Sequence, residues 1–168
     1  MADIPPISSF DTSFLINLEV NYPIDLFPAV WEKMDEFFAA KKGYIIDLVS
    51  AEIEKKDDKV HEWISHRAGG IVKRLTDEEL LKAQEILAKF PYWIDVQATL
   101  TSADPFVVAN AFFSGATVVT HEAKVQIREN TRKIKIPNAC EAFGVRSIHT
   151  NPGSSVFTEF FREQGWRF

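Results

Sequence analysis

The stretch SSFDTSFLINL, Ser8–Leu18, places one acidic residue between two apolar segments. Residues 7–10 have the character of a short buried strand, and TSFLINLEV, which follows Asp11, predicts a short helix. In an α/β sheet, ligands bind beyond the carboxyl ends of the strands, which is where Asp11 would lie. Asp11 is therefore the first candidate functional residue, and a role as the cap of the following helix is its alternative.

Short apolar segments alternate with helix-like segments along the rest of the chain. Strands are predicted at YIIDLV (44–49), ATVVT (116–120) and IKIP (134–137), with WIDVQATL (93–100) as a further candidate. Helices are predicted over 27–42, 50–68, 76–90 and 103–115, and the third begins with a capping-box pattern. This alternation is typical of an α/β fold with a mostly parallel sheet covered by helices on both faces.

Composition limits the class of protein. A chain of 168 residues, 46% hydrophobic and 26% charged, has the size and composition of a single globular domain, which we expect over 1–168 with an aromatic C-terminal helix at about 155–168. The net charge of -5 argues against a protein that coats long nucleic acid with its whole surface. The single cysteine, Cys140, excludes an internal disulfide and fits a reducing compartment. No apolar run is long enough to span a membrane and no secretion signal is visible, so we expect a cytoplasmic protein without membrane contact.

Three further acidic residues follow the predicted strands. Glu52 lies on the helix after 44–49, Asp104 begins the helix at 103–115, and Glu122 follows 116–120. If these carboxylates converge with Asp11, they repel one another unless cations lie between them. Mg²⁺ and Mn²⁺ prefer such oxygen ligands, and two ions about 3.5–4 Å apart can activate a water for phosphodiester hydrolysis. The pattern therefore predicts nuclease chemistry.

Each acid also has an ordinary structural explanation. Glu52 would belong to a solvated helix face, Asp104 would stabilise a helix N-terminus, and Glu122 would be a loop residue. Glu54, and more weakly Asp47, are alternatives to Glu52. Only the joint placement of the four acids favours a metal site.

The order of the acidic motifs resembles that of the PIN domain, a compact metal-dependent nuclease fold. FDTSFLINL, AEIEKKDD, SADPFVVANA and VVTHE are similar, in this order, to its four acidic motifs. YPIDLFPAVWEKMDEFF, KIPNACEAFGV and FFREQGWRF further resemble a prokaryotic PIN subfamily catalogued as a domain of unknown function. This resemblance covers nearly the whole chain and implies a three-layer α/β/α sandwich with a central, mostly parallel sheet.

The resemblance also implies a function and partners. It implies an Mg²⁺- or Mn²⁺-dependent endoribonuclease, since many relatives are toxins that cleave RNA, are restrained by a protein antitoxin and often form homodimers. Glu122 stands where many PIN domains have the shorter aspartate, which leaves open whether one or two ions bind. The residues that the resemblance implies as catalytic metal ligands are Asp11, Glu52, Asp104 and Glu122, with Ser13 and Thr120 as residues that orient them.

Basic residues crowd the segment that follows Glu122, namely Lys124, Arg128, Arg132, Lys133 and Lys135. Beside an acidic metal cluster, this segment is expected to position RNA phosphates, through Lys124, Arg128 and Arg132 first. A solvated basic surface is the alternative.

Other functional classes fit the sequence less well. A phosphoryl-transfer domain of the aspartyl-phosphate type commonly has a second aspartate two positions after the first, where this chain has Ser13. Neither GxGxxG nor GxxxxGK occurs, so the glycine-rich loop of a nucleotide-binding domain is missing. The main alternative to a nuclease is a non-catalytic PIN-like module that binds nucleic acid or protein.

Overall fold

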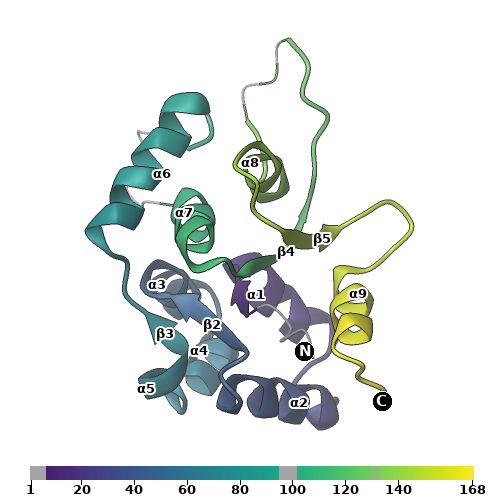
Figure 1. Cartoon of the computed structure of the whole chain (residues 1–168). Helices are drawn as coiled ribbons and strands as arrows, with labels where there is room; N and C mark the ends of the chain where they lie inside the picture. Colours follow the sequence, from purple (N-terminus) through teal and green to yellow (C-terminus); the bar gives the residue numbers. More distant parts are fainter. Residues whose placement is uncertain (1–6, 95–101, 130, 132) are drawn as a thin grey trace, which may run out of the picture.

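A parallel β-sheet forms the centre of the protein (Figure 1). The computed structural model describes residues 7–94, 102–129, 131 and 133–168. Within them the strand order is β3-β2-β1-β4-β5, and every neighbouring pair is parallel. The strands are β1 (Ser8–Phe10), β2 (Gly43–Ile46), β3 (Val72–Lys73), β4 (Thr117–Ala123) and β5 (Ser147–Thr150).

Helices cover both faces of this sheet. Figure 1 shows α6, α7 and α8 on one side and α2 and α9 on the other. The predicted three-layer α/β/α fold is therefore confirmed. The helices are α1 (Thr12–Asn21), α2 (Pro28–Ala39), α3 (Asp47–Lys56), α4 (Asp58–Ser65), α5 (Ala68–Ile71), α6 (Asp77–Lys89), α7 (Asp104–Ser114), α8 (Ile136–Ala142) and α9 (Val156–Glu163).

An aromatic cluster holds α1, α2 and α9 against β1. The Phe10 ring lies 5.3 Å from that of Phe14, 5.3 Å from that of Phe38 and 5.3 Å from that of Phe160, measured between ring centroids. Phe10, Phe14 and Phe160 have no exposed surface. Since each buried aromatic ring removes a large apolar area from water, the C-terminal aromatic segment is part of the core.

A buried polar network joins the other face of the sheet to its helices. The Tyr44 hydroxyl of β2 donates to Asn110 Oδ1 of α7 at 2.5 Å, and Asn110 Nδ2 donates to Glu79 Oε1 of α6 at 3.0 Å. Glu79 also accepts the Thr76 N–H through Oε2, which is one half of the predicted capping box. Because buried polar groups need partners, this network fixes α6 and α7 on β2.

Several element boundaries differ from the sequence-based prediction. The C-terminal helix predicted at about 155–168 ends at Glu163, where Gln164 and Gly165 follow it. The strand predicted at 44–49 ends at Ile46, because Asp47 begins α3 and its carboxylate accepts the Leu48 N–H at 2.9 Å. The single helix predicted at 50–68 is interrupted at Asp57, whose side chain accepts the Val60 N–H at 3.0 Å and caps α4. Asp57 thus starts a new helix as its N-cap, whereas Asp47 is the first residue of α3 and bonds only the N–H of its neighbour.

The prediction of a strand at 134–137 is wrong. Ile136 and Pro137 form the first turn of α8, where the missing N–H of proline costs nothing. The short strands β3 and β5 were not predicted, and the strand candidate at 93–100 falls mostly outside the described residues. None of the helices in the described part is long and apolar enough to cross a membrane.

Candidate active site

The four predicted acids line one cleft of about 290 Å³. Asp11 directly follows β1, Glu122 lies near the end of β4, Glu52 is on α3 and Asp104 is the first residue of α7. The structure therefore brings together carboxylates from four separate segments at the end of the sheet where ligands bind in α/β folds. The described residues that line this cleft are Asp11, Thr12, Ser13, Ile16, Asn17, Glu52, Lys56, Ser102, Asp104 and Glu122.

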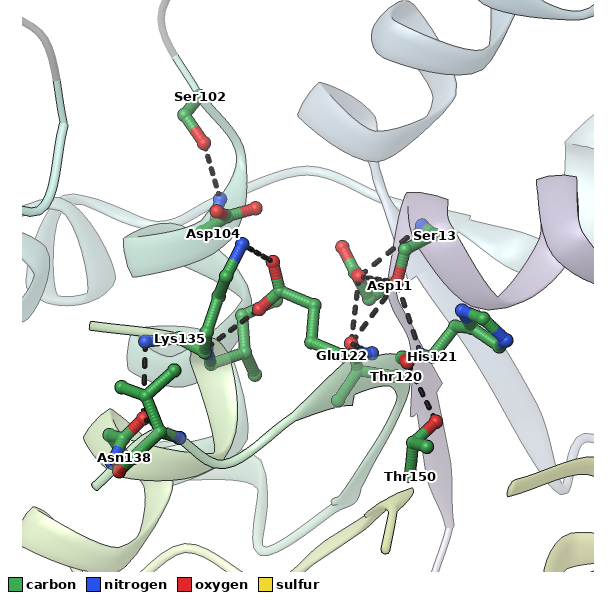
Figure 2. A network of polar contacts seen from close by, with 12 residues as sticks. Asp11, Ser13, Ser102, Asp104, Thr120, His121, Glu122, Lys135, Asn138 and Thr150 are labelled. Carbon is green, nitrogen blue, oxygen red and sulfur yellow. Dashed lines mark hydrogen bonds and ion pairs between the residues drawn. The ribbon is translucent and has the colours of Figure 1, made fainter. Parts of the chain in front are cut away.

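Asp11 uses its two carboxylate oxygens differently (Figure 2). Oδ2 accepts hydrogen bonds from Ser13 Oγ at 2.6 Å and Thr120 Oγ1 at 3.0 Å, and also from the Ser13 N–H as the cap of α1. Oδ1 is buried and has no hydrogen-bond partner among the described residues. Burial, together with the charge of Glu122, raises the pKa of Asp11 to about 6 against the opposing hydrogen bonds from Ser13 and Thr120. Asp11 is therefore a helix cap that keeps one oxygen free for a ligand.

Asp104 is the most strongly perturbed acid of the cleft. Its backbone N–H donates to Ser102 Oγ at 3.4 Å, which starts α7. Burial and the negative charges of Asp11, Glu122 and Glu52 raise the pKa of Asp104 to about 8. Burial is the larger cause of this shift, and the neighbouring carboxylates add to it, so the ionised form of Asp104 is disfavoured in the metal-free cleft.

Glu52 connects the surroundings of the two aspartates. Its Oε2 accepts from Thr12 Oγ1 at 2.6 Å, and its Oε1 accepts the Ala103 N–H at 2.8 Å. Thr12 follows Asp11 and Ala103 precedes Asp104, so this one carboxylate helps to fix the position of α7 relative to α1. Lys56 Nζ lies 3.9 Å from Glu52 Oε2.

The two alternatives to Glu52 lie elsewhere. Glu54 is exposed, and neither Glu54 nor Asp47 is among the described residues that line the cleft. Of the three acids considered on this helix, Glu52 is therefore the one that faces the other carboxylates.

Glu122 points toward the start of α8 (Figure 2). Its Oε2 accepts the Ile136 N–H at 2.8 Å, and its Oε1 pairs with Lys135 Nζ at 3.4 Å. His121, next to it, stacks on Phe157 with ring centroids 5.4 Å apart. Glu122 is thus held by the protein itself, in contrast to the free oxygen of Asp11.

The basic residues predicted to contact phosphates are partly engaged. Lys124 Nζ pairs with Glu141 at 2.6 Å, and Arg128 Nη2 donates to Gln126 at 3.0 Å. Arg132 lies outside the described residues. The sequence-based reasoning missed Lys56 as a cleft residue, although its position one helical turn after Glu52 places both on the same helix face.

The aspartate pair fits a hard divalent cation. No group of three or more His, Cys, Asp or Glu side chains in the described part of the chain is arranged to hold a metal ion directly. Asp11 nevertheless offers a buried oxygen without a partner, and the raised pKa of Asp104 reflects an uncompensated negative charge. Since Mg²⁺ commonly binds one or two carboxylates and keeps several waters, Asp11 and Asp104 form a suitable donor set.

The fold of the chain is similar to that of solved structures. The chain is similar to VapBC2 from Rickettsia felis, whose structure was solved bound to a DNA fragment from its promoter. The TM-score is 0.53 and the sequence identity is 11%, over 86% of this chain and 99% of that chain. FitAcB from Neisseria gonorrhoeae gives a TM-score of 0.49 and 17% identity over 87% of this chain and 98% of that chain. No curated protein sequence matches the chain.

The parallel sheet, its two helical layers and the acidic cleft at its edge thus define a PIN-like α/β domain. The chain belongs to the family described as Domain of unknown function (DUF4411), which matches residues 9–168.

Proposed function

We propose that this protein is an Mg²⁺- or Mn²⁺-dependent nuclease that hydrolyses phosphodiester bonds of RNA. The observation that carries the proposal is the pair formed by Asp11 and Asp104, two largely buried carboxyls with raised pKa values in one cleft. Neither aspartate forms an ion pair with a basic side chain in the described part of the chain. Two buried acids without a counter-charge are costly, and a bound cation would remove that cost.

The surrounding residues have distinct parts in this proposal. Asp11 and Asp104 would hold the cation, with Ser13 and Thr120 fixing the Asp11 carboxylate through its other oxygen. A bound divalent cation would supply an activated water and neutralise charge on the phosphate. Glu52 helps to fix the positions of the two aspartates relative to each other, because it accepts hydrogen bonds from their chain neighbours Thr12 and Ala103. Direct ligation by Glu52 and Glu122 was expected from the sequence, and nothing in the structure tests it; for Glu122, a different role is proposed below.

The choice of RNA, and a place in a toxin–antitoxin pair, rest on the PIN-like fold. VapBC2 is a toxin–antitoxin protein with a similar fold, which supports a protein antitoxin as partner of this chain as well. A homodimer and a cytoplasmic location belong to the same proposal. The basic segment between β4 and α8 supports contact with a phosphate backbone.

A cleavage assay tests the proposal. Purified protein is incubated with a fluorescent mixture of single-stranded RNAs and Mn²⁺ or Mg²⁺, and initial rates are compared with those of Asp104→Asn and of samples with chelator. Because the substitution removes one of the two charges that would hold the ion, we expect the rate to fall by at least about 100-fold. The matched control is Glu54→Gln, which changes an exposed acid on α3 and should keep the wild-type rate.

Two outcomes would contradict the nuclease proposal. Cleavage that survives both Asp104→Asn and chelator would place the activity in a contaminant or in another site. If the protein binds RNA but cleaves none of it, with or without metal, a non-catalytic binding module becomes the better account. The hydrogen bonds that already engage Glu52 and Glu122 are the observation that favours this second candidate.

A further inference from the structure

We propose that Glu122 is a positioning residue and not a metal ligand, and that it holds the Lys135 ammonium group at the acidic cleft for contact with the scissile phosphate. The proposal rests on the proposed nuclease function and selects Lys135 from the basic residues that follow Glu122 as the one that contacts the substrate. Lys135 does not itself line the cleft, but its ammonium group lies 3.4 Å from Glu122, which does. It would therefore add a positive charge beside the exchangeable cation held by Asp11 and Asp104.

Glu122 binds two neighbouring groups at the start of α8. Its Oε1 pairs with Lys135 Nζ at 3.4 Å, while its Oε2 accepts the N–H of the next residue, Ile136, at 2.8 Å. The Glu122 side chain is mostly buried, with 18% of its surface exposed, so both contacts are partly shielded from water. Figure 2 shows the Glu122 and Lys135 side chains directed toward each other. A metal ion on Glu122 would have to compete with both of these partners.

The backbone of Lys135 is fixed independently by Asn138. Asn138 Oδ1 accepts the N–H groups of Lys135 at 3.2 Å and of Val125 at 3.1 Å, and its Nδ2 donates to the Val125 carbonyl at 2.8 Å. Asn138 is buried, with 2% of its surface exposed. Asn138 thus joins the two ends of the basic segment and fixes the backbone of Lys135, while the Lys135 ammonium group is held by Glu122 alone among the described residues. Prearranged charges of this kind contribute more to catalysis than flexible surface charges do.

Lys135 keeps donors available for a phosphate. An ammonium group has three N–H donors, and the ion pair with Glu122 uses one of them. The Lys135 side chain is 49% exposed, so a substrate can reach it. Since a phosphodiester gains negative charge at its oxygens during hydrolysis, a held ammonium group stabilises the transition state more than the bound substrate.

Lys56 and Glu52, which also line the cleft, form a longer ion pair than Lys135 and Glu122 do. Their closest approach is 3.9 Å, and the Lys56 side chain is 58% exposed. Both lie within α3, and no side chain comparable to Asn138 fixes Lys56 in the described part of the chain. Lys135 is therefore the cation that the structure holds more firmly at the site.

The test uses Lys135→Met, Lys135→Arg and a matched control, Lys33→Met. Lys33 also pairs with a glutamate, Glu36, and its side chain is 42% exposed, but it lies on α2 away from the cleft. In the Mn²⁺-dependent RNA assay we expect Lys135→Met to lower kcat by about 10- to 100-fold with KM changed by less than about threefold. Arginine should restore most of kcat because it keeps the charge, and Lys33→Met should match the wild type.

The role of Glu122 is tested by calorimetric titration with Mn²⁺. If Glu122 is a positioning residue, Glu122→Gln keeps the Mn²⁺ dissociation constant within about threefold of wild type, whereas Asp104→Asn weakens it by at least about tenfold. The same Glu122→Gln variant should lower kcat, because a neutral amide holds the Lys135 ammonium group less strongly than a carboxylate does.

The inference is overturned if Glu122→Gln weakens Mn²⁺ binding as much as Asp104→Asn does. It is also overturned if Lys135→Met cleaves RNA as fast as Lys33→Met. A wild-type protein that binds Mn²⁺ but cleaves no RNA contradicts the proposed function, and the Mn²⁺ titrations then still decide whether Glu122 is a ligand.

Discussion

The four acids of the cleft fall into two chemically different pairs. Asp11 has an unpartnered oxygen and Asp104 has a pKa raised to about 8, whereas each glutamate accepts a backbone N–H and pairs with a lysine. Both oxygens of each glutamate have a partner, whereas one oxygen of Asp11 has none among the described residues. The aspartates are therefore the carboxyls of the cleft without a basic partner in the described part of the chain.

This difference predicts how Asp104→Asn changes stability in metal-free protein. Since the pKa of Asp104 lies at about 8 in the folded protein and near its ordinary value of 3.8 in the unfolded chain, folding retains a proton that the unfolded chain releases. The contribution of this retained proton to the free energy of unfolding is complete below about pH 4 and is lost as pH rises through about 8. Asparagine avoids this loss because it carries no charge at any pH.

We therefore expect Asp104→Asn to be more stable than wild type at pH 8 in chelator, with the advantage shrinking toward pH 5. The melting temperature should differ by about 2–4 °C for each kcal/mol of relieved repulsion. Thermal unfolding of both proteins from pH 5 to pH 8 measures this difference. A difference that does not change with pH would show that Asp104 ionises without cost.

Sequence reasoning identified the acids but not their individual environments. Asp11, Glu52, Asp104 and Glu122 could be selected because each follows a predicted strand or begins a helix. The hydrogen bonds that Glu52 accepts from Ala103 and Glu122 accepts from Ile136 join residues that are 51 and 14 positions apart in the sequence. Such contacts depend on tertiary structure, and no local pattern encodes them.

At the scale of elements, the N-terminal ends of helices position the acids of the cleft. Asp11 caps α1, Asp104 begins α7, and the start of α8 donates to Glu122. Free N–H groups at these helix starts attract carboxylates, which is why acids gather where α1, α7 and α8 begin. The position of the sheet relative to these helices therefore decides the geometry of the site.

The packing of β2 against the aromatic cluster gives a test at this scale. A Cβ atom added at Gly43 would lie 2.7 Å from Phe10 Cε2 and 2.7 Å from Phe37 Cε1, both in buried rings. We expect Gly43→Ala to lower the free energy of unfolding by about 1–3 kcal/mol, because the rings must shift in a packed core. Urea unfolding measures the change.

Gly70→Ala serves as the control for this substitution, since a Cβ at Gly70 meets nothing within 4 Å. It lies in α5, where alanine is at least as favourable as glycine. Equal stability of Gly43→Ala and wild type would show that the aromatic cluster accommodates an extra methyl group without strain.

Elements with strong local signals were predicted well, and short ones were not. The capping box of Thr76 and Glu79 marks the start of α6, and Gly115, with a φ of 71°, ends α7 as expected. In contrast, IKIP looks like a strand because isoleucine favours strands, yet Pro137 fits the first turn of α8. The two-residue strand β3 is too short to show any periodicity.

At the scale of the whole molecule, the parallel sheet explains why distant acids meet. β1 pairs with β2 on one side and with β4 on the other, so the segments after these strands emerge at the same edge. Glu52 and Glu122 are thereby brought close to Asp11, and α7 adds Asp104. The alternation of strands and helices was enough to predict this fold class, although the strand order was not predicted.

A cation in the cleft would link α1 and α7, which lie far apart in the sequence and carry Asp11 and Asp104. Binding to the folded state alone raises the stability of the whole chain by an amount that grows with the ion concentration, about 2.7 kcal/mol at 100 times the dissociation constant. The fold and the site are therefore expected to respond together to the metal.

The most direct test of the central claim, that the aspartate pair holds a divalent cation, is a calorimetric titration of the purified protein with Mn²⁺. The wild type and Glu54→Gln are predicted to bind Mn²⁺ saturably and with equal affinity, and Asp104→Asn to bind at least about tenfold more weakly. Absence of saturable binding to the wild type, or equal affinity of the wild type and Asp104→Asn, would contradict the claim.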